Sequence, residues 1–219
     1  MGRAAVRLHA LCATIAWCCA LNAMWIAFTL LGGVVLGVGP ATVAACVLSR
    51  RRINGESIHL RDFVATWRRE FLRGTAVVLP VAIVVVVLLS NYAFFSMLGP
   101  GVGGARLLTL VALIVAIGAA SYVGPMYAHY DLPLRAVAAK SLRFALARPA
   151  STIILLFVFA ALAFVTAAVP VLLAVVSIGA WWHASTWLCL RFFQENEDRL
   201  ARPAEQPQRV LPVEPLRIR

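Results

Sequence analysis

The sequence predicts an all-α fold, a polytopic transmembrane helical bundle with about five spans. Of the 219 residues 62% are hydrophobic, and the mean hydropathy is +0.88, whereas soluble domains are about 45–50% apolar. The apolar residues form unbroken runs, which argues against the alternating strands of an outer-membrane barrel. The net charge of +11 is typical of positive loops that face the cytoplasm and its anionic lipids. We therefore expect contact with the lipid bilayer of a bacterial cytoplasmic membrane, and no nucleic acid partner.

The first apolar stretch, residues 11–49, is too long for one span. As a helix it would measure about 58 Å, against a hydrocarbon core of about 30 Å. Gly39 and Pro40 are the expected place for a break, because proline removes a helical hydrogen bond. We predict a first span over 11–38 and a shorter apolar piece near the interface. Gly33 and Gly37 form a Gly-x-x-x-Gly pair, which either lets another helix approach closely or only softens the helix before Pro40.

An N-terminal hairpin of two short spans is the alternative for this stretch. Five spans place 17 of the 20 Lys and Arg residues inside, whereas the hairpin places 19 inside. Charge thus slightly favours the hairpin, while helix length and the internal repeat described below favour five spans. We adopt five spans and leave the side of the N-terminus open.

A basic amphipathic segment over 58–73 follows Arg50, Arg51 and Arg52. Its apolar residues recur at helical spacing and form one stripe, made of Leu60, Phe63, Val64, Trp67 and Phe71. Charged residues occupy the other side. We expect a helix that lies flat on the cytoplasmic leaflet or docks on a partner.

The remaining spans are predicted over 75–98, 107–123, 151–169 and 171–193, with a second basic segment at 134–148. Gly124 and Pro125 mark the end of the third span. Residues 1–198 then form a single transmembrane domain. The Pro- and Arg-rich tail, 199–219, has no periodicity and is expected to be disordered.

An internal repeat is visible between the two halves of the chain. The end of the first span, 38–40, and the end of the third, 123–125, both read Val-Gly-Pro, and Leu60-Arg61 matches Leu134-Arg135. Each half then contains a span, a Gly-Pro step, a basic interfacial helix and a returning span. Chance similarity between apolar helices is the alternative.

Few polar residues lie inside the predicted spans, and they are the candidates for contact with a ligand. Asn22 is expected to bond across to another helix, with a substrate contact as the less favoured alternative. Asn91 lies toward the outer end of its span. Trp181, Trp182 and His183 belong to an indole-rich run that forms an interface belt or packs in the bundle, or else lines a cavity that could stack a sugar ring.

No catalytic signature accompanies these residues. The sequence lacks a zinc-protease helix, a nucleophile elbow, a phosphate-binding loop and a dinucleotide fingerprint. The five cysteines lie in or beside apolar runs with no Cys-x-x-Cys pair, which indicates buried small residues rather than disulfides or a metal site. We expect no enzyme activity, no cofactor and no metal.

The chain resembles the YesL-like family of small bacterial membrane proteins, a family of unknown function. The resemblance runs from about residue 10 to 193. It rests on Leu21-Asn22-x-x-Trp25, the run 36–42, Arg50-Arg51-Arg52, Gly55-Glu56, Phe63-x-x-x-Trp67-Arg68, Tyr130-Asp131 and Ala147-Arg148-Pro149. Gly39 departs from the family, which often has Phe before the proline.

The resemblance implies an accessory role in carbohydrate uptake, because such proteins tend to be encoded beside ABC-type sugar importers. Permease or ATPase subunits of an importer are then the implied partners. A stand-alone carrier or channel for a small neutral solute is the alternative function.

Overall fold

Every regular element between residues 3 and 201, the part of the chain that the structure describes, is helical. In this computed structural model the order is α1 (Arg3–Leu31), α2 (Val35–Ile53), α3 (Leu60–Arg69), α4 (Phe71–Met97), η1 (Pro100–Val102), α5 (Gly103–His129), α6 (Leu134–Ala147), α7 (Pro149–Ala168), η2 (Leu173–Ser177) and α8 (Ile178–Ala201). The all-α class is confirmed. The tail is predicted to be disordered from residue 199, but the structure continues α8 to Ala201. The remaining tail residues, 202–219, lie outside the described residues.

Within residues 3–201, five helical stretches are long and apolar enough to cross a membrane, as expected of a multi-pass protein. They are Ala5–Leu31, Phe71–Met97, Gly103–His129, Pro149–Ala168 and Leu173–Arg199. Little of their surface is buried inside the chain, since only 17% of the most apolar window of the second stretch and 11% of that of the fourth are covered. Such apolar exposure requires a lipid environment.

α1 and α2 form an antiparallel hairpin. α1 ends at Leu31, seven residues before the predicted end of the first span, and α2 returns alongside it. Arg52, in the last turn of α2, donates a hydrogen bond of 3.1 Å to the carbonyl of Ala13. The basic end of α2 and the N-terminal half of α1 therefore lie side by side. The first candidate span therefore ends at Leu31 instead of residue 38, and α2 packs antiparallel to it. Within residues 3–201, α2 is not one of the five stretches that are long and apolar enough to cross a membrane.

The glycines of the hairpin explain where the chain turns. Gly33 adopts φ +77° in the turn, a conformation that glycine tolerates best. A Cβ on Gly32 would lie 2.4 Å from the Cα of Gly37, and a Cβ on Gly37 would lie 2.3 Å from the carbonyl oxygen of Thr29. Gly37 thus permits the close approach of α1 and α2, whereas Gly33 is not on a helix face and the predicted Gly33–Gly37 helical pair does not exist.

Pro40 lies inside α2 and does not end a helix, contrary to the predicted break. Its missing N–H leaves the carbonyl of Leu36 without a backbone donor. The hydroxyl of Thr75 on α4 lies 2.9 Å from that carbonyl and 2.6 Å from the carbonyl of Phe71, so the two carbonyls share its single proton. A Cβ on Gly39 would lie 2.5 Å from the Cα of Thr75. Gly39 and Pro40 therefore form the crossing point of α2 and α4, where the small residue lets the backbones touch.

Gly124 and Pro125 are likewise internal to a helix. Both are buried in α5, which continues past the predicted end of the third span to His129. A Cβ on Gly124 would lie 2.7 Å from the Sγ of Cys46 on α2. This pair forms the crossing of α5 over α2, so each Gly-Pro step of the repeat is a helix crossing rather than a helix end.

The element order follows the predicted repeat, with a long, a short and a long helix in α2–α3–α4 and again in α5–α6–α7. The matched residues Leu60 and Leu134 each begin the short helix of their unit. The hydroxyl of Thr75 donates to the Phe71 carbonyl four residues back, and that of Thr152 donates to the Arg148 carbonyl in the same way. α1 and α8 lie outside the two units and pack on each other.

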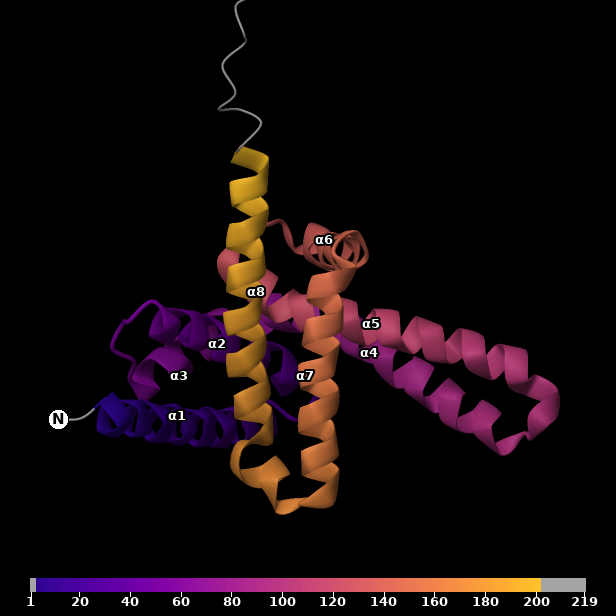
Figure 1. Cartoon of the computed structure of the whole chain (residues 1–219), viewed down its shortest axis with the longest axis horizontal. Helices are drawn as coiled ribbons and strands as arrows, with labels where there is room; N and C mark the ends of the chain where they lie inside the picture. Colours follow the sequence, from indigo (N-terminus) through magenta and orange to yellow (C-terminus); the bar gives the residue numbers. More distant parts are fainter. Residues whose placement is uncertain (1–2, 202–219) are drawn as a thin grey trace, which may run out of the picture.

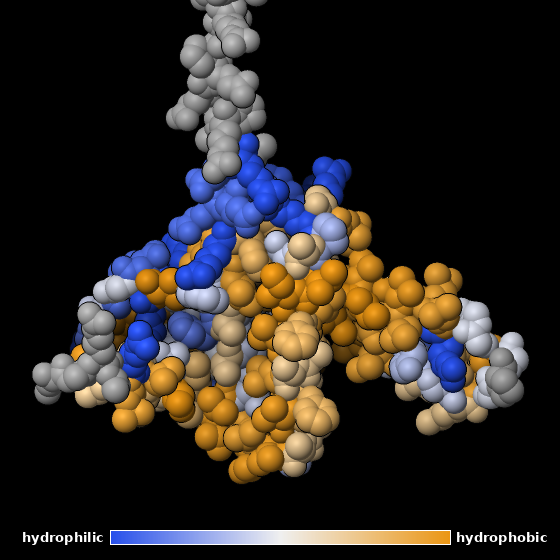
Figure 2. All heavy atoms as spheres, in the orientation of Figure 1, coloured by the Kyte–Doolittle hydropathy of each residue, from blue (hydrophilic) through white to orange (hydrophobic). Residues whose placement is uncertain are grey.

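The described helices are arranged as three arms (Figure 1). α1 to α3 form one arm, the α4–α5 hairpin projects away from them, and α7 and α8 run side by side as the third. Hydrophilic residues gather over the C-terminal turns of α8 and around α6 and α2, while most of the arms are apolar (Figure 2). We call this region the polar end: the C-terminal turns of α2, α5 and α8, the α3–α4 junction, and α6.

Candidate functional site

The three consecutive arginines of α2 point in different directions, since successive residues on a helix lie about 100° apart. The Arg52 guanidinium donates to α1 and lies 5.0 Å from the ring centroid of Trp17, in a cation–π contact. Arg51 faces the loop that follows α2. Arg50 lines a cavity at the polar end. The triplet therefore fastens α1, orders a loop and supplies one side of the candidate site.

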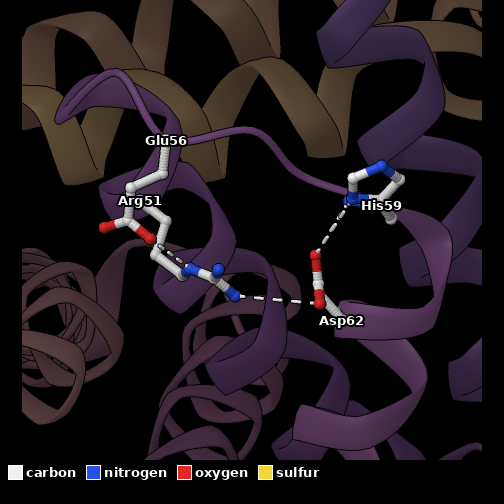
Figure 3. A network of polar contacts seen from close by, with 4 residues as sticks. All are labelled: Arg51, Glu56, His59 and Asp62. Atoms are coloured by element: carbon white, nitrogen blue, oxygen red, sulfur yellow. Dashed lines mark hydrogen bonds and ion pairs between the residues drawn. The ribbon is translucent and has the colours of Figure 1, made fainter.

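Arg51 organises the connection between α2 and α3 (Figure 3). Its Nε donates to Glu56 at 2.7 Å, and its Nη1 lies 4.0 Å from the carboxylate of Asp62. The backbone N–H of His59 donates to Asp62 at 2.9 Å, which caps the start of α3. The hydrogen bond with Glu56 raises the pKa of Arg51. Ion pairs this exposed contribute little stability, so their role is to fix the direction of α3.

The predicted apolar stripe of α3 packs inside the protein. Phe63 is fully buried and its ring centroid lies 5.2 Å from that of Phe28 on α1, while the Trp67 and Phe28 centroids are 5.4 Å apart. The Phe71 ring meets Trp67 edge-on at 5.0 Å. Leu60, at the start of α3, is exposed. The stripe thus holds α3 against α1 and directs the α3–α4 junction toward the polar end.

A polar cavity of about 580 Å³ lies at this junction. α2, the α3–α4 junction, and the end of α5 with the segment after it contribute its walls. The lining residues with polar side chains are Arg50, Arg69, Glu70, Arg73, Tyr127, His129, Tyr130 and Asp131. Arg50 is half-buried, whereas Arg69 and Arg73 are exposed, so the last two lie toward its mouth.

Glu70 joins the two repeated units inside this cavity. The side chain is only 9% exposed, accepts a 2.5 Å hydrogen bond from the hydroxyl of Tyr127 and receives a 2.9 Å bond from Nε of Arg69. A buried carboxylate requires such partners to offset its lost hydration. Glu70 comes from the first unit and Tyr127 from the second, so this bond fixes how the units meet.

A second cavity, of about 420 Å³, shares Arg50 and His129 with the first. α8 provides its opposite wall, where the Arg191 guanidinium lies 4.0 Å from the Trp187 ring centroid. α8 is also bound to the α5 end through Tyr130, whose hydroxyl donates to Glu197 at 2.8 Å. Burial and this hydrogen bond raise the pKa of Tyr130, so the hydroxyl keeps its proton and remains a donor.

Comparison with known proteins finds a family match in the N-terminal part of the chain. Residues 18–92 match the model of a family described as "Protein of unknown function, DUF624". The chain is 38% identical over 141 residues to "Uncharacterized protein YesV" of Bacillus subtilis (strain 168), covering 63% of this chain and 66% of that protein. It is 30% identical over 141 residues to "Uncharacterized protein YesL" of the same strain, covering 62% and 65%. The chain is thus similar to YesL-like proteins of unknown function.

These matches span slightly less than two thirds of the relatives' own length. No solved structure matches the chain. The family match covers part of α1, all of α2 and α3, and most of α4. It therefore includes Arg50, Arg69, Glu70 and Arg73, but not the tyrosines that the second unit brings to the cavity.

Asn22 is a structural residue. Its side chain is fully buried. Its amide nitrogen donates to the carbonyls of Leu173 and Ala174 at 3.2 and 2.7 Å, and its oxygen accepts from the N–H groups of Ile178 and Gly179 at 2.8 and 3.0 Å. Two donated and two accepted bonds use the full capacity of the amide, so none is left for a ligand.

The other predicted intramembrane candidates are not brought together. Trp181 and Trp182 line an apolar cavity of about 560 Å³ that also touches Trp25, between α1, α7 and α8. His183 is half-buried, and Asn91 is exposed on α4. Residues 3–201 contain no group of three His, Cys, Asp or Glu side chains placed to hold a metal ion.

Sequence reasoning did not assemble the polar cavity. The polar run from Tyr127 to Asp131, just after a Gly-Pro step, and the arginine triplet were both visible in the sequence. Nothing local linked them, because the segments are about 80 residues apart. One feature of the sequence could have linked the two segments. Each of them follows a Gly-Pro step, and the two steps occupy equivalent positions in the internal repeat.

Proposed function

We propose that this protein is a non-enzymatic accessory or regulatory component of carbohydrate uptake by an ABC-type importer in the bacterial cytoplasmic membrane. Its polar end would face the cytoplasm, where the excess of arginine belongs. Similarity to the YesL-like family motivates the link to sugar import. The permease or ATPase subunit of the importer is the proposed partner.

The observation that carries this proposal is the outer face of α6. One side of the helix packs inward through Val137, Ser141 and Ala145. The other side exposes apolar residues between cations: Arg135, Lys140, Leu142, Arg143 and Leu146. A rigid helix with apolar anchors between basic side chains fits a partner surface with apolar pockets and acidic rims.

The test is purification of the tagged protein from its native membranes in mild detergent, with bound proteins identified by mass spectrometry. We expect a carbohydrate importer subunit to be retained, and Leu146→Glu to reduce its recovery at least tenfold. Leu60→Glu on α3 is the matched control, since Leu60 is 62% exposed and Leu146 is 60% exposed. Isolation of the protein alone, together with unchanged sugar uptake after gene deletion, would refute the proposal.

A carrier for a small neutral solute is the second candidate. It is favoured by the cavity lined by Trp25, Trp181 and Trp182, because indole faces can stack on sugar rings. Of its polar lining residues, Thr166 and Ser177 bond to each other at 2.7 Å. Proteoliposomes that contain only this protein test it, and uptake of a labelled sugar above that of empty vesicles is the supporting result.

A further inference from the structure

We propose that the polar cavity at the polar end binds a phosphate group carried on a larger molecule, either a phospholipid headgroup or a soluble phosphate monoester. This inference concerns a binding site and does not rest on the proposed role in sugar uptake. Three features carry it: the charge of the walls, two buried nitrogen atoms without partners, and the size of the space.

The walls carry unneutralised positive charge. Arg50, Arg69 and Arg73 line the cavity together with two carboxylates, those of Glu70 and Asp131. Glu70 is already engaged by Tyr127 and Arg69. Within residues 3–201 neither Arg50 nor Arg73 has a carboxylate within ion-pair distance. A guanidinium is always charged and matches the geometry of phosphate oxygens, so the two arginines favour an anion.

Two buried nitrogen atoms of residues that line the cavity also lack hydrogen-bond partners. Nε of Arg50 and Nδ1 of His129 are buried, and neither has a partner among the described residues. An unpaired buried polar group costs about 1–3 kcal/mol, and more when it is charged, so native proteins rarely keep one without a reason. An N–H of the Arg50 guanidinium can only donate. A phosphate oxygen supplies the acceptor that it lacks.

The space exceeds a bare phosphate. The cavity of about 580 Å³ lies within the range of about 300–1,000 Å³ that small-molecule sites occupy. A neighbouring cavity of about 420 Å³ shares Arg50 and His129 with it. Leu132 and Leu134 add apolar surface to the wall. Both a glycerol-linked lipid headgroup and a phosphorylated small molecule fit these features.

The experiment uses the full-length protein, delipidated in detergent, with two probes. Thermal unfolding is followed with increasing glucose 6-phosphate at constant ionic strength, and retention of phosphatidylglycerol is measured by native mass spectrometry. The test variant Arg50→Gln/Arg73→Gln removes two cavity arginines. The control Arg61→Gln/Arg68→Gln removes two exposed arginines of α3 that do not line the cavity, so both variants lose the same net charge.

We expect the wild-type protein and the control to bind at least one probe, and the cavity variant to bind it at least tenfold more weakly. Binding of phosphatidylglycerol alone assigns the site to lipid, and binding of glucose 6-phosphate alone assigns it to a soluble ligand. If wild-type protein binds neither probe, or if both variants lose binding equally, the proposal is overturned. Should the double variant not fold, Arg73→Gln alone replaces it, because this side chain is exposed and makes no hydrogen bond within the described residues.

Discussion

Replacing Asn22 with leucine tests the bond network that joins α1 to α8. The substitution keeps the volume similar and removes all four hydrogen bonds to the backbone around η2. Side-chain hydrogen bonds between membrane helices average about 0.6 kcal/mol, and bonds in soluble proteins about 1 kcal/mol. Four bonds then amount to about 2.4–4 kcal/mol. Because two backbone carbonyls and two N–H groups lose their partner, we expect the upper part of this range.

The free energy of unfolding is measured by titration with sodium dodecyl sulfate in dodecyl maltoside micelles. Asn91→Leu is the matched control, since Asn91 is exposed on α4, and we expect it to change the free energy by less than about 0.5 kcal/mol. Equal stability of Asn22→Leu and wild type would show that the amide does not hold α1 to α8.

Further substitutions test the other contacts that shape the molecule. Gly179→Ala places a Cβ 2.0 Å from the carbonyl oxygen of Cys18 and should destabilise the protein by about 1–3 kcal/mol, whereas Gly103→Ala, which meets nothing within 4 Å, should be tolerated in the same unfolding titration. Trp67→Glu removes the packing of α3 on α1 and should cost about 3–5 kcal/mol, seen as loss of the monodisperse peak in size-exclusion chromatography, while Arg68→Gln on the exposed face should elute as wild type. Reporter fusions at the N-terminus and in the α2–α3 loop should report the same side of the membrane; opposite sides would contradict the hairpin.

The short helices show what local sequence could predict. The apolar stripe of α3 recurs at helical spacing, and both α3 and α6 begin at the leucine that the repeat identified. Periodicity and composition are local properties, so they can be read without the fold. Whether the stripe contacts lipid, a partner or the same chain is not local, and here Phe28 of α1 covers it.

The hairpin shows why the rest could not be predicted. Glycines 32 and 33 fit both a soft helix and a turn, and the deciding contact is the close approach of Gly32 to Gly37. Pro40 is accommodated inside α2 with the hydroxyl of Thr75 beside the carbonyl that proline leaves free. This second contact is tertiary, because Thr75 lies in another helix.

The candidate site follows from how the two repeated units meet. The first unit supplies the cations Arg50 and Arg73, and the second supplies Tyr127 and His129 from the end of its long helix. Because Glu70 of the first unit bonds to Tyr127 of the second, the cavity forms only when the units are packed together. The Gly-Pro crossings hold α2 against α4 and α5 against α2, and so set this packing. The repeat therefore places different residues of equivalent helices on opposite walls of one cavity, which gives the site both its charge and its hydrogen-bonding groups.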